Sequence, residues 1–380
     1  MITLVKNVRQ LVTALGSDPV SGHRMGELEV RENVSMVLRG DRISVVGPTD
    51  AALKVDLVID AAGGIVVPGL VDACATAGRD ARGPLLAEDS EAELGRLRVG
   101  LETLLRHGTT SAEVRAVAPD GEEGLEEVLA CIQQLAHRVP LRLSIAFLGA
   151  PRRDENSERS DRITTLIGET IPSVSRRRLA TTCVVLCGEN GYGRKEARAV
   201  LRAARGAGLE LKVQASGTDA EALQAAGDLA AGAIDHLTGP SFAPRPLALL
   251  KKTGAIPILL PGSSLAEGGP RPPARPLVEA GLAVALGSAA DLGAGGVLSL
   301  WTGISLAVRE YNMSLAEAII AATLNAAAAI GASHQVGTLE PGKLADFAIL
   351  ELDDYRRIPD FIVGLPIRSV VVGGREAARG

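Results

Sequence analysis

The feature that most constrains the fold is an alternation of apolar runs and amphipathic segments, which begins at Pro68 and continues to about residue 335. The runs that read as strands are 70–75, 109–114, 141–148, 182–186, 209–215, 233–237, 255–260 and 282–286. Helical patterns lie between them, at 91–106, 121–137, 195–206, 219–230 and 272–280. Near-continuous apolar strands separated by helices indicate parallel strands that are buried on both faces. Eight such units in about 250 residues predict a (β/α)8 TIM barrel.

The two ends of the chain have a different pattern. Short β-prone runs separated by turn residues fill residues 1–67, and β-prone runs return after Gly337. We therefore expect residues 1–67 and 336–380 to form one composite β-sandwich domain, and residues 68–335 to form the barrel. Before the second β-region, Ser314 and Glu317 have the spacing of a capping box that starts a helix over 314–331.

Composition excludes several classes of function. The net charge is −5 with both signs interspersed, so no basic surface for nucleic acid is expected. The chain contains no apolar run of the roughly 18 residues that span a bilayer, and its start lacks the apolar core of a signal peptide. The four cysteines are interpreted as reduced thiols. These features predict a cytoplasmic protein that binds neither membrane nor nucleic acid.

Several motifs together indicate a family. The stretch from Ile65 to Gly78 has the form P-G-hydrophobic-hydrophobic-D, followed by alternating small residues, and Gly337 to Asp346 reads G-x-L-x-x-G-x-x-A-D. Further motifs are Arg106 to Arg115, Asp235-His236-Leu237 and Leu260-Pro261-Gly262. Nearly the whole chain resembles the amidohydrolase superfamily, and it is most similar to the imidazolonepropionases. The resemblance implies an amidohydrolase-like α/β fold, with a TIM barrel beside a small β-sandwich.

The same resemblance implies that the catalytic metal is absent. The family holds zinc or iron with a histidine pair on its first strand, a histidine on its fifth and an aspartate on its eighth. Here Cys74, Thr76, Gln214 and Ala289 stand in those places, and Gly217 aligns with the catalytic glutamate. Catalytic zinc sites use histidine and carboxylate ligands, so we expect no cofactor. Metal-dependent hydrolysis is then predicted to be lost, because bound water reaches a pKa of about 7 only beside the cation.

Two alternatives keep some chemistry. Asp291 lies two residues beyond Ala289, so a bulge could return a carboxylate to a catalytic position, and His236 is the other candidate catalytic residue. Alternatively, Cys74, Cys187, His236 and Asp291 follow the carboxyl ends of barrel strands and could form a soft ligand set for zinc. Either arrangement would leave a hydrolase that acts on C–N bonds of a cyclic amide or amidine with an altered or absent metal site.

Binding without catalysis is the remaining hypothesis. The candidate contacts for a small anionic or heterocyclic ligand are His236, Arg79, Glu113 and Arg115. If Glu113 faces the barrel, it needs a partner such as Arg115 or Arg79, because a buried charge is stable only when paired. The resemblance also implies pairing, as a homodimer or as a heteromer with an active relative. A non-catalytic scaffold or regulatory partner is therefore the first functional hypothesis, and a ligand-binding module is the second.

Overall fold

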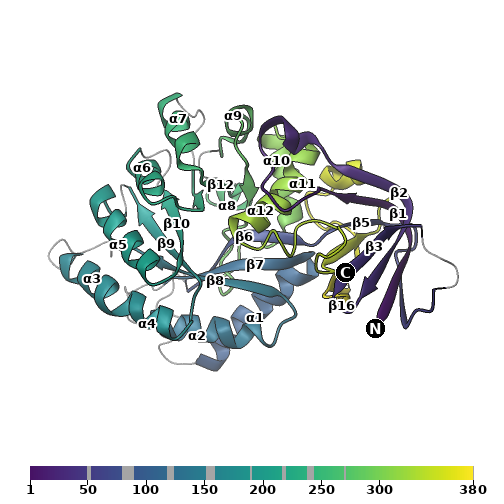
Figure 1. The fold of residues 1–380 in the computed structure, drawn as a ribbon, viewed down its shortest axis with the longest axis horizontal. Helices are drawn as coiled ribbons and strands as arrows, with labels where there is room; N and C mark the ends of the chain where they lie inside the picture. The colour runs from purple at the N-terminus through teal and green to yellow at the C-terminus, as the bar shows by residue number, and fades with distance from the viewer. Residues whose placement is uncertain are drawn as a thin grey trace.

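The computed structural model describes residues 1–48, 53–78, 90–117, 124–150, 159–188, 191–215, 220–237, 244–268 and 271–379. These residues form two sheets of eight strands each. In Figure 1 helices surround one sheet, which contains β6 to β13. The other sheet, which contains β1 to β5 and β14 to β16, lies beside it, where both chain ends are found. The molecule therefore consists of a helix-covered barrel and an attached sheet built from the two ends of the chain.

The barrel strands follow one another in sequence order, and each pairs in parallel with the next. They are β6 (Leu70–Ala77), β7 (Thr109–Ala116), β8 (Arg142–Gly149), β9 (Thr182–Cys187), β10 (Glu210–Ala215), β11 (Ala233–Asp235), β12 (Ile256–Leu259) and β13 (Ala285–Leu286). Each strand overlaps one of the eight apolar runs, so the predicted barrel is confirmed.

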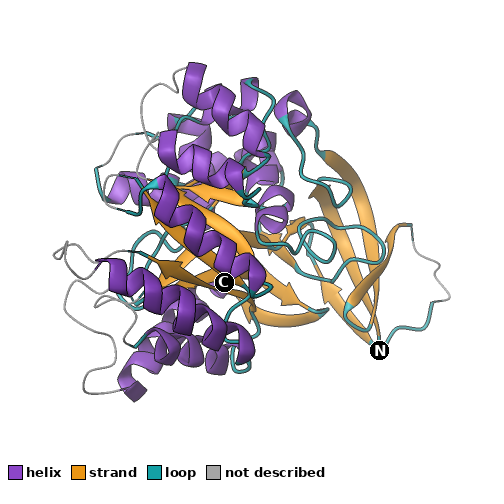
Figure 2. Ribbon diagram, turned by 60° about the vertical axis from the view of Figure 1, so that its left-hand side comes forward, coloured by secondary structure: helices purple, strands orange, loops and turns teal. Residues whose placement is uncertain are grey.

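The helices that cover these strands are shown in purple in Figure 2. They are α1 (Ser90–Arg106), α2 (Leu125–Ala136), α3 (Arg159–Thr165), α4 (Ile171–Arg176), α5 (Arg194–Gly206), α6 (Ala220–Asp228), α7 (Pro244–Thr253), α8 (Pro261–Ala266), α9 (Ala274–Glu279), α10 (Leu300–Glu310), α11 (Leu315–Ala321) and α12 (Leu324–Ala329). Ser314 and Glu317 form the predicted capping box. The single helix expected over 314–331 is divided at Thr323, whose hydroxyl donates to the carbonyl of Ile319 2.7 Å away.

Backbone hydrogen bonds from the segment after β13 close the barrel against β6. Ala289 N donates to Cys74 O at 2.6 Å, Thr76 N donates to Ala290 O at 2.9 Å, and Leu292 N donates to Thr76 O at 2.9 Å. The Asp72 carboxylate reinforces this closure, because its Oδ2 accepts from Ser288 Oγ at 2.6 Å and its Oδ1 accepts from Ser288 N at 2.9 Å. Three of the positions that the resemblance assigns to metal ligands, Cys74, Thr76 and Ala289, therefore have a backbone role in the seam.

The second sheet has the strand order β16-β15-β14-β5-β1-β2-β3, and β4 pairs with β1 outside this path. Its strands are β1 (Ile2–Thr13), β2 (Glu29–Arg39), β3 (Arg42–Gly47), β4 (Leu57–Asp60), β5 (Ile65–Pro68), β14 (Phe347–Leu350), β15 (Ile367–Val372) and β16 (Arg375–Arg379). Both chain ends thus join one β-structure, as expected. Seven of these strands form one hydrogen-bonded path, and β4 joins it through β1.

Part of the N-terminal region leaves this sheet and packs on the barrel. A short 3₁₀ helix (Gly22–Gly26) contacts α9 and α11. The Asn325 side chain binds the backbone of Val20 in both directions, at 2.8 Å each. The N-terminal region therefore contributes to both parts of the fold.

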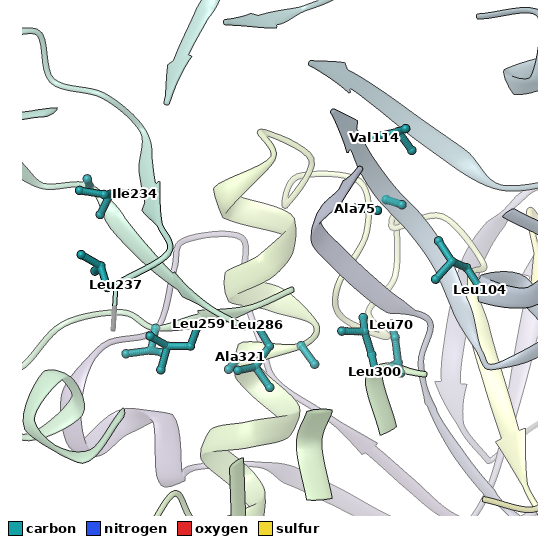
Figure 3. Close-up of a cluster of buried hydrophobic side chains, with 14 of the residues drawn as sticks. Leu70, Ala75, Leu104, Val114, Ile234, Leu237, Leu259, Leu286, Leu300 and Ala321 are labelled. Atoms are coloured by element: carbon teal, nitrogen blue, oxygen red, sulfur yellow. The ribbon is translucent and has the colours of Figure 1, made fainter. Parts of the chain in front are cut away.

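The main apolar core lies between the barrel strands and their helices. Figure 3 shows it with Leu70, Ala75 and Val114 from strands and Leu104 and Leu300 from helices. The second sheet has its own core around Met36, Leu38 and Phe347. Among the residues that the structure describes, no helix is long and apolar enough to cross a membrane.

Candidate functional site

Charged side chains occupy the inner face of otherwise apolar barrel strands. On β7, Ala112, Val114 and Ala116 join the core under the helices, and Glu113 and Arg115 alternate with them. On β10, Lys212 and Gln214 alternate in the same way with core residues. Because successive side chains of a strand point to opposite faces, these residues project into the barrel, where they are brought together with Asp235 of β11.

The guanidinium of Arg115 is the centre of this cluster. Its Nη2 donates to Asp235 Oδ2 at 2.6 Å, and its Nη1 lies 3.4 Å from Asp235 Oδ1. Nη1 also donates to Gln214 Oε1 at 2.9 Å. The side chains of Arg115 and Asp235 have no exposed surface. The guanidinium on β7 therefore binds side chains of β10 and β11, which pair with each other but not with β7.

Glu113 receives two positive charges. Lys212 Nζ donates to its Oε2 at 2.5 Å, and Arg115 Nη2 lies 3.5 Å from its Oε1. The prediction that Glu113 needs Arg115 as a partner is confirmed. The pairing with Lys212 was not expected, and it leaves the directly paired charges balanced at two carboxylates and two cations.

The buried charges shift one another's pKa values. Burial alone would raise the pKa of Asp235, but Arg115 and the His236 hydrogen bond outweigh it and hold that pKa well below its usual range. Burial would likewise lower the pKa of Arg115, yet Asp235 and its other neighbours raise it further. No cation among the described residues is paired with Asp72, so burial raises its pKa, although Ser288 and Cys74 donate hydrogen bonds to it.

His236 lies at the end of β11 in a left-handed backbone conformation, with φ of +57°. Its Nδ1 is 2.7 Å from Asp235 Oδ1, and 23% of its side chain is exposed. Among the described residues that the sequence predicts to contact a ligand, His236 is the one with exposed surface. Glu113 and Arg115 are completely buried and paired, and Arg79 lies outside the described residues.

The side chains at the four positions that the resemblance assigns to metal ligands do not have the chemistry of a zinc or iron site. Cys74 is buried, and burial raises the pKa of its thiol. Thr76 Oγ1 donates to Ala290 O at 3.3 Å, and Gln214 Oε1 accepts from Arg115. Ala289 has only a methyl group, and Gly217 lies outside the described residues. This donor set lacks the imidazoles and the carboxylate with which zinc or iron is usually held at a catalytic site.

The alternative set of Cys74, Cys187, His236 and Asp291 is not assembled as a ligand group. In the parts of the chain that the structure describes, no three His, Cys, Asp or Glu side chains are placed to hold a metal ion. Cys187 packs in the core under the helices, whereas Cys74 belongs to a different apolar cluster. Asp291 Oδ1 instead accepts from Gly293 N and Ala294 N, at 2.9 and 3.1 Å, and so caps its own turn.

Sequence reasoning missed several members of the site, namely Lys212, Asp235, Asp72 and Ser288. A usable signal was present on β10, where Lys212 and Gln214 alternate with apolar residues in a strand that should be buried on both faces. The same two-residue period marks Glu113 and Arg115. Asp235 gave no such signal, because β11 is only three residues long.

The fold and the site define a class of protein. A family model described as the amidohydrolase family matches residues 65–377. The chain therefore belongs to the amidohydrolase family. Solved structures agree with the fold: an amidohydrolase from a Sargasso Sea environmental sample has a TM-score of 0.75 at 20% identity, covering 100% of this chain and 93% of that one. A triazine hydrolase variant has a TM-score of 0.72 at 18% identity, covering 99% and 94%.

Within that family, the chain is similar to proteins named imidazolonepropionase along nearly its full length. The protein of that name from Solibacter usitatus is 34% identical, covering 97% of both chains. Another, from Rubrobacter xylanophilus, is 31% identical, covering 98% of this chain and 97% of that one.

Proposed function

We propose that this protein is an imidazolonepropionase-like member of the amidohydrolase family that has lost metal-dependent hydrolysis and acts as a non-catalytic scaffold or regulatory partner. The observation that carries the proposal is the donor set at the aligned positions: Cys74, Thr76, Gln214 and Ala289 supply no imidazole and no carboxylate. Hydrolysis of a stable C–N bond without the metal would have to find many kcal/mol of transition-state stabilisation elsewhere.

The partner in this proposal is a second copy of the chain or an active relative, in the cytoplasm. The retained barrel and terminal sheet support it, because the chain keeps the whole fold of its relatives while the ligand positions have changed together. Paired subunits present related surfaces, so a chain with this fold can occupy a subunit position without catalysis.

A second candidate function is the binding of a small anionic or heterocyclic ligand at His236. The observation in its favour is that His236 is partly exposed while Asp235 fixes its ring through Nδ1. An oriented imidazole beside a buried ionic cluster can donate or accept a hydrogen bond at its other nitrogen.

Metal analysis of protein purified without chelator tests the loss of hydrolysis. We expect far less than one equivalent of zinc or iron, and no turnover in the reaction after which the relatives are named. One equivalent of tightly bound metal together with turnover would refute the proposal. The informative comparison is a restored variant carrying Cys74→His, Thr76→His, Gln214→His and Ala289→Asp, which we expect to be less stable than the parent without metal.

Co-purification and thermal shift separate the two roles. A partner role predicts a defined oligomer by light scattering, with unchanged melting temperature in the presence of small heterocycles. A ligand role predicts a rise in melting temperature with imidazole-propionate, and its loss in His236→Asn. Asparagine is the matched control because it tolerates the left-handed backbone at this position.

A further inference from the structure

The barrel interior contains a cation that is part of the chain. The Arg115 guanidinium is completely buried and contacts acceptors on three strands: Asp235 by both oxygens, Gln214 Oε1 at 2.9 Å and Glu113 Oε1 at 3.5 Å. A single positive group therefore lies where strands from both sides of the barrel converge.

One of these acceptors, Gln214, stands at a position that the resemblance assigns to a metal ligand. The amide oxygen of Gln214 is occupied by the guanidinium, so this residue serves the arginine as an acceptor. At the Gln214 position, where the resemblance implies a ligand for a metal cation, the residue present binds a cation that the chain itself supplies, the Arg115 guanidinium.

The surroundings of the guanidinium have the chemistry of a cation site. Glu113 and Asp235 have no exposed surface, and Lys212 neutralises only Glu113 directly. Without Arg115, the only side-chain hydrogen bond left to Asp235 within the described part of the chain would be the one with His236. Arg115 Nε and Glu113 Oε1 find no hydrogen-bond partner among the described residues, although both are buried. The surroundings therefore hold the planar guanidinium by charge and by two parallel contacts, from Nη1 and Nη2 to the two oxygens of Asp235.

We propose that the Arg115 guanidinium is a built-in cation of the barrel interior, and that a chain lacking it would take up a small planar cation of the guanidinium or amidinium class at the same place. The inference deepens the proposed function and rests on it, because it identifies what replaces the metal. We expect selectivity for shape as well as for charge. The acceptors on Asp235 and Gln214 are placed for the planar, forked N–H groups of a guanidinium, which an ammonium group lacks.

Chemical rescue of Arg115→Ala tests this inference. The melting temperature of the variant should fall by many degrees, and millimolar methylguanidinium should restore at least half of the loss. Recovery should grow with the logarithm of the concentration, as expected for a ligand that binds the folded state. Methylammonium should restore clearly less. No recovery with methylguanidinium, or equal recovery with methylammonium, would overturn the proposal.

The matched control is Arg142→Ala. Arg142 makes the same two-pronged contact with Asp346, but 37% of its side chain is exposed, so its removal leaves an open site that should gain nothing from methylguanidinium. Recovery of both variants alike would show a general solvent effect and overturn the inference. Recovery of Arg115→Ala by zinc chloride, and not by methylguanidinium, would assign a metal site and also overturn it.

A second variant covers the case in which Arg115→Ala does not fold. Adding Asp235→Asn removes the carboxylate left without its cation, so the double variant should be recovered as folded protein, and methylguanidinium should no longer stabilise it. A double variant that is as damaged as the single one would contradict the charge argument. Metal content of the unmodified protein is measured separately, so failure of the proposed function and failure of this inference remain distinguishable.

Discussion

The protein contains the same Arg–Asp chemistry in two environments. Arg115 and Asp235 meet inside the barrel, where neither side chain has exposed surface. Arg142, at the start of β8, meets Asp346 with Nε–Oδ2 at 2.5 Å and Nη2–Oδ1 at 3.1 Å, and this pair fastens the barrel to the terminal sheet. Arg142 is partly exposed, and Asp346 also accepts from Gly373 N at 2.7 Å.

The difference between the two pairs is in what remains when the arginine is removed. The Asp346 side chain is buried as well, but its arginine partner is exposed to water, and the backbone N–H of Gly373 still binds its carboxylate. Asp235 would stay in the barrel with a charge that His236 alone contacts. A buried ion pair is a weak source of net stability, yet the loss of one partner is costly because the other charge is stranded. Arg115 is therefore expected to be needed for the stability of the barrel, whereas Arg142 is expected to contribute little to that stability.

The largest expected effect is that of Arg115→Met. We predict a fall of about 3–5 kcal/mol in the free energy of unfolding, since a buried carboxylate loses its cation while the volume is nearly kept. Arg142→Met should cost about 1 kcal/mol, because its pair is partly solvent-screened. Urea unfolding monitored by circular dichroism measures both. Similar losses in the two variants would remove the distinction between the interior and the outer pair.

Asp72 sharpens the comparison, because it is a buried carboxylate without a cation. Asp72→Ala should cost about 1–3 kcal/mol, since Ser288 N, Ser288 Oγ and Cys74 N lose their acceptor. Asp72→Asn should be close to neutral: Oδ1 still accepts both N–H groups, and the Ser288 hydroxyl can turn toward Cys74 O, 3.4 Å away. Thermal unfolding of the two variants checks this. Equal damage in both would mean that the charge of Asp72 is essential.

The pH dependence separates the two buried aspartates. The raised pKa of Asp72 means that the folded state holds this proton more tightly than the unfolded chain does, so stability falls as pH rises above about 3.9, by at most about 1.4 kcal/mol per pH unit. The lowered pKa of Asp235 has the opposite sign, with stability lost as pH falls below that value. The unfolding free energy of the parent minus that of Asp72→Asn should therefore decrease with rising pH, because only the parent contains this titrating carboxyl group. A difference that grows with pH would contradict the assignment.

The smallest expected effect is that of a chelator. If the interior cation is Arg115, a strong chelator has nothing to remove, and the melting temperature should stay within about one degree, because only a ligand of the folded state shifts it. The restored four-residue variant, loaded with zinc before chelation, is the comparison in which a decrease is expected. A fall of several degrees in the unmodified protein would show that the interior depends on a metal.

The sequence determined the frame of this molecule. Each barrel strand was visible as an apolar run because parallel strands are buried on both faces, so the pattern needs no knowledge of neighbours. The joining of both chain ends in one β-domain followed from their β-rich patterns and the Gly337–Asp346 motif. The residue types at Cys74, Thr76, Gln214 and Ala289 were also readable from the sequence, since residue identity alone decides whether an imidazole or a carboxylate is present.

Only the tertiary structure decided what occupies the barrel interior. Arg115, Gln214 and Asp235 are far apart in the chain, and their meeting depends on strand register and on which face each residue takes. The same geometry removed Cys187 from the expected ligand set by placing it under the helices, and turned Asp291 onto its own loop. Side-chain type is a local property that the sequence states directly, whereas the pairing of buried charges depends on distances of a few ångströms that only the closed barrel fixes.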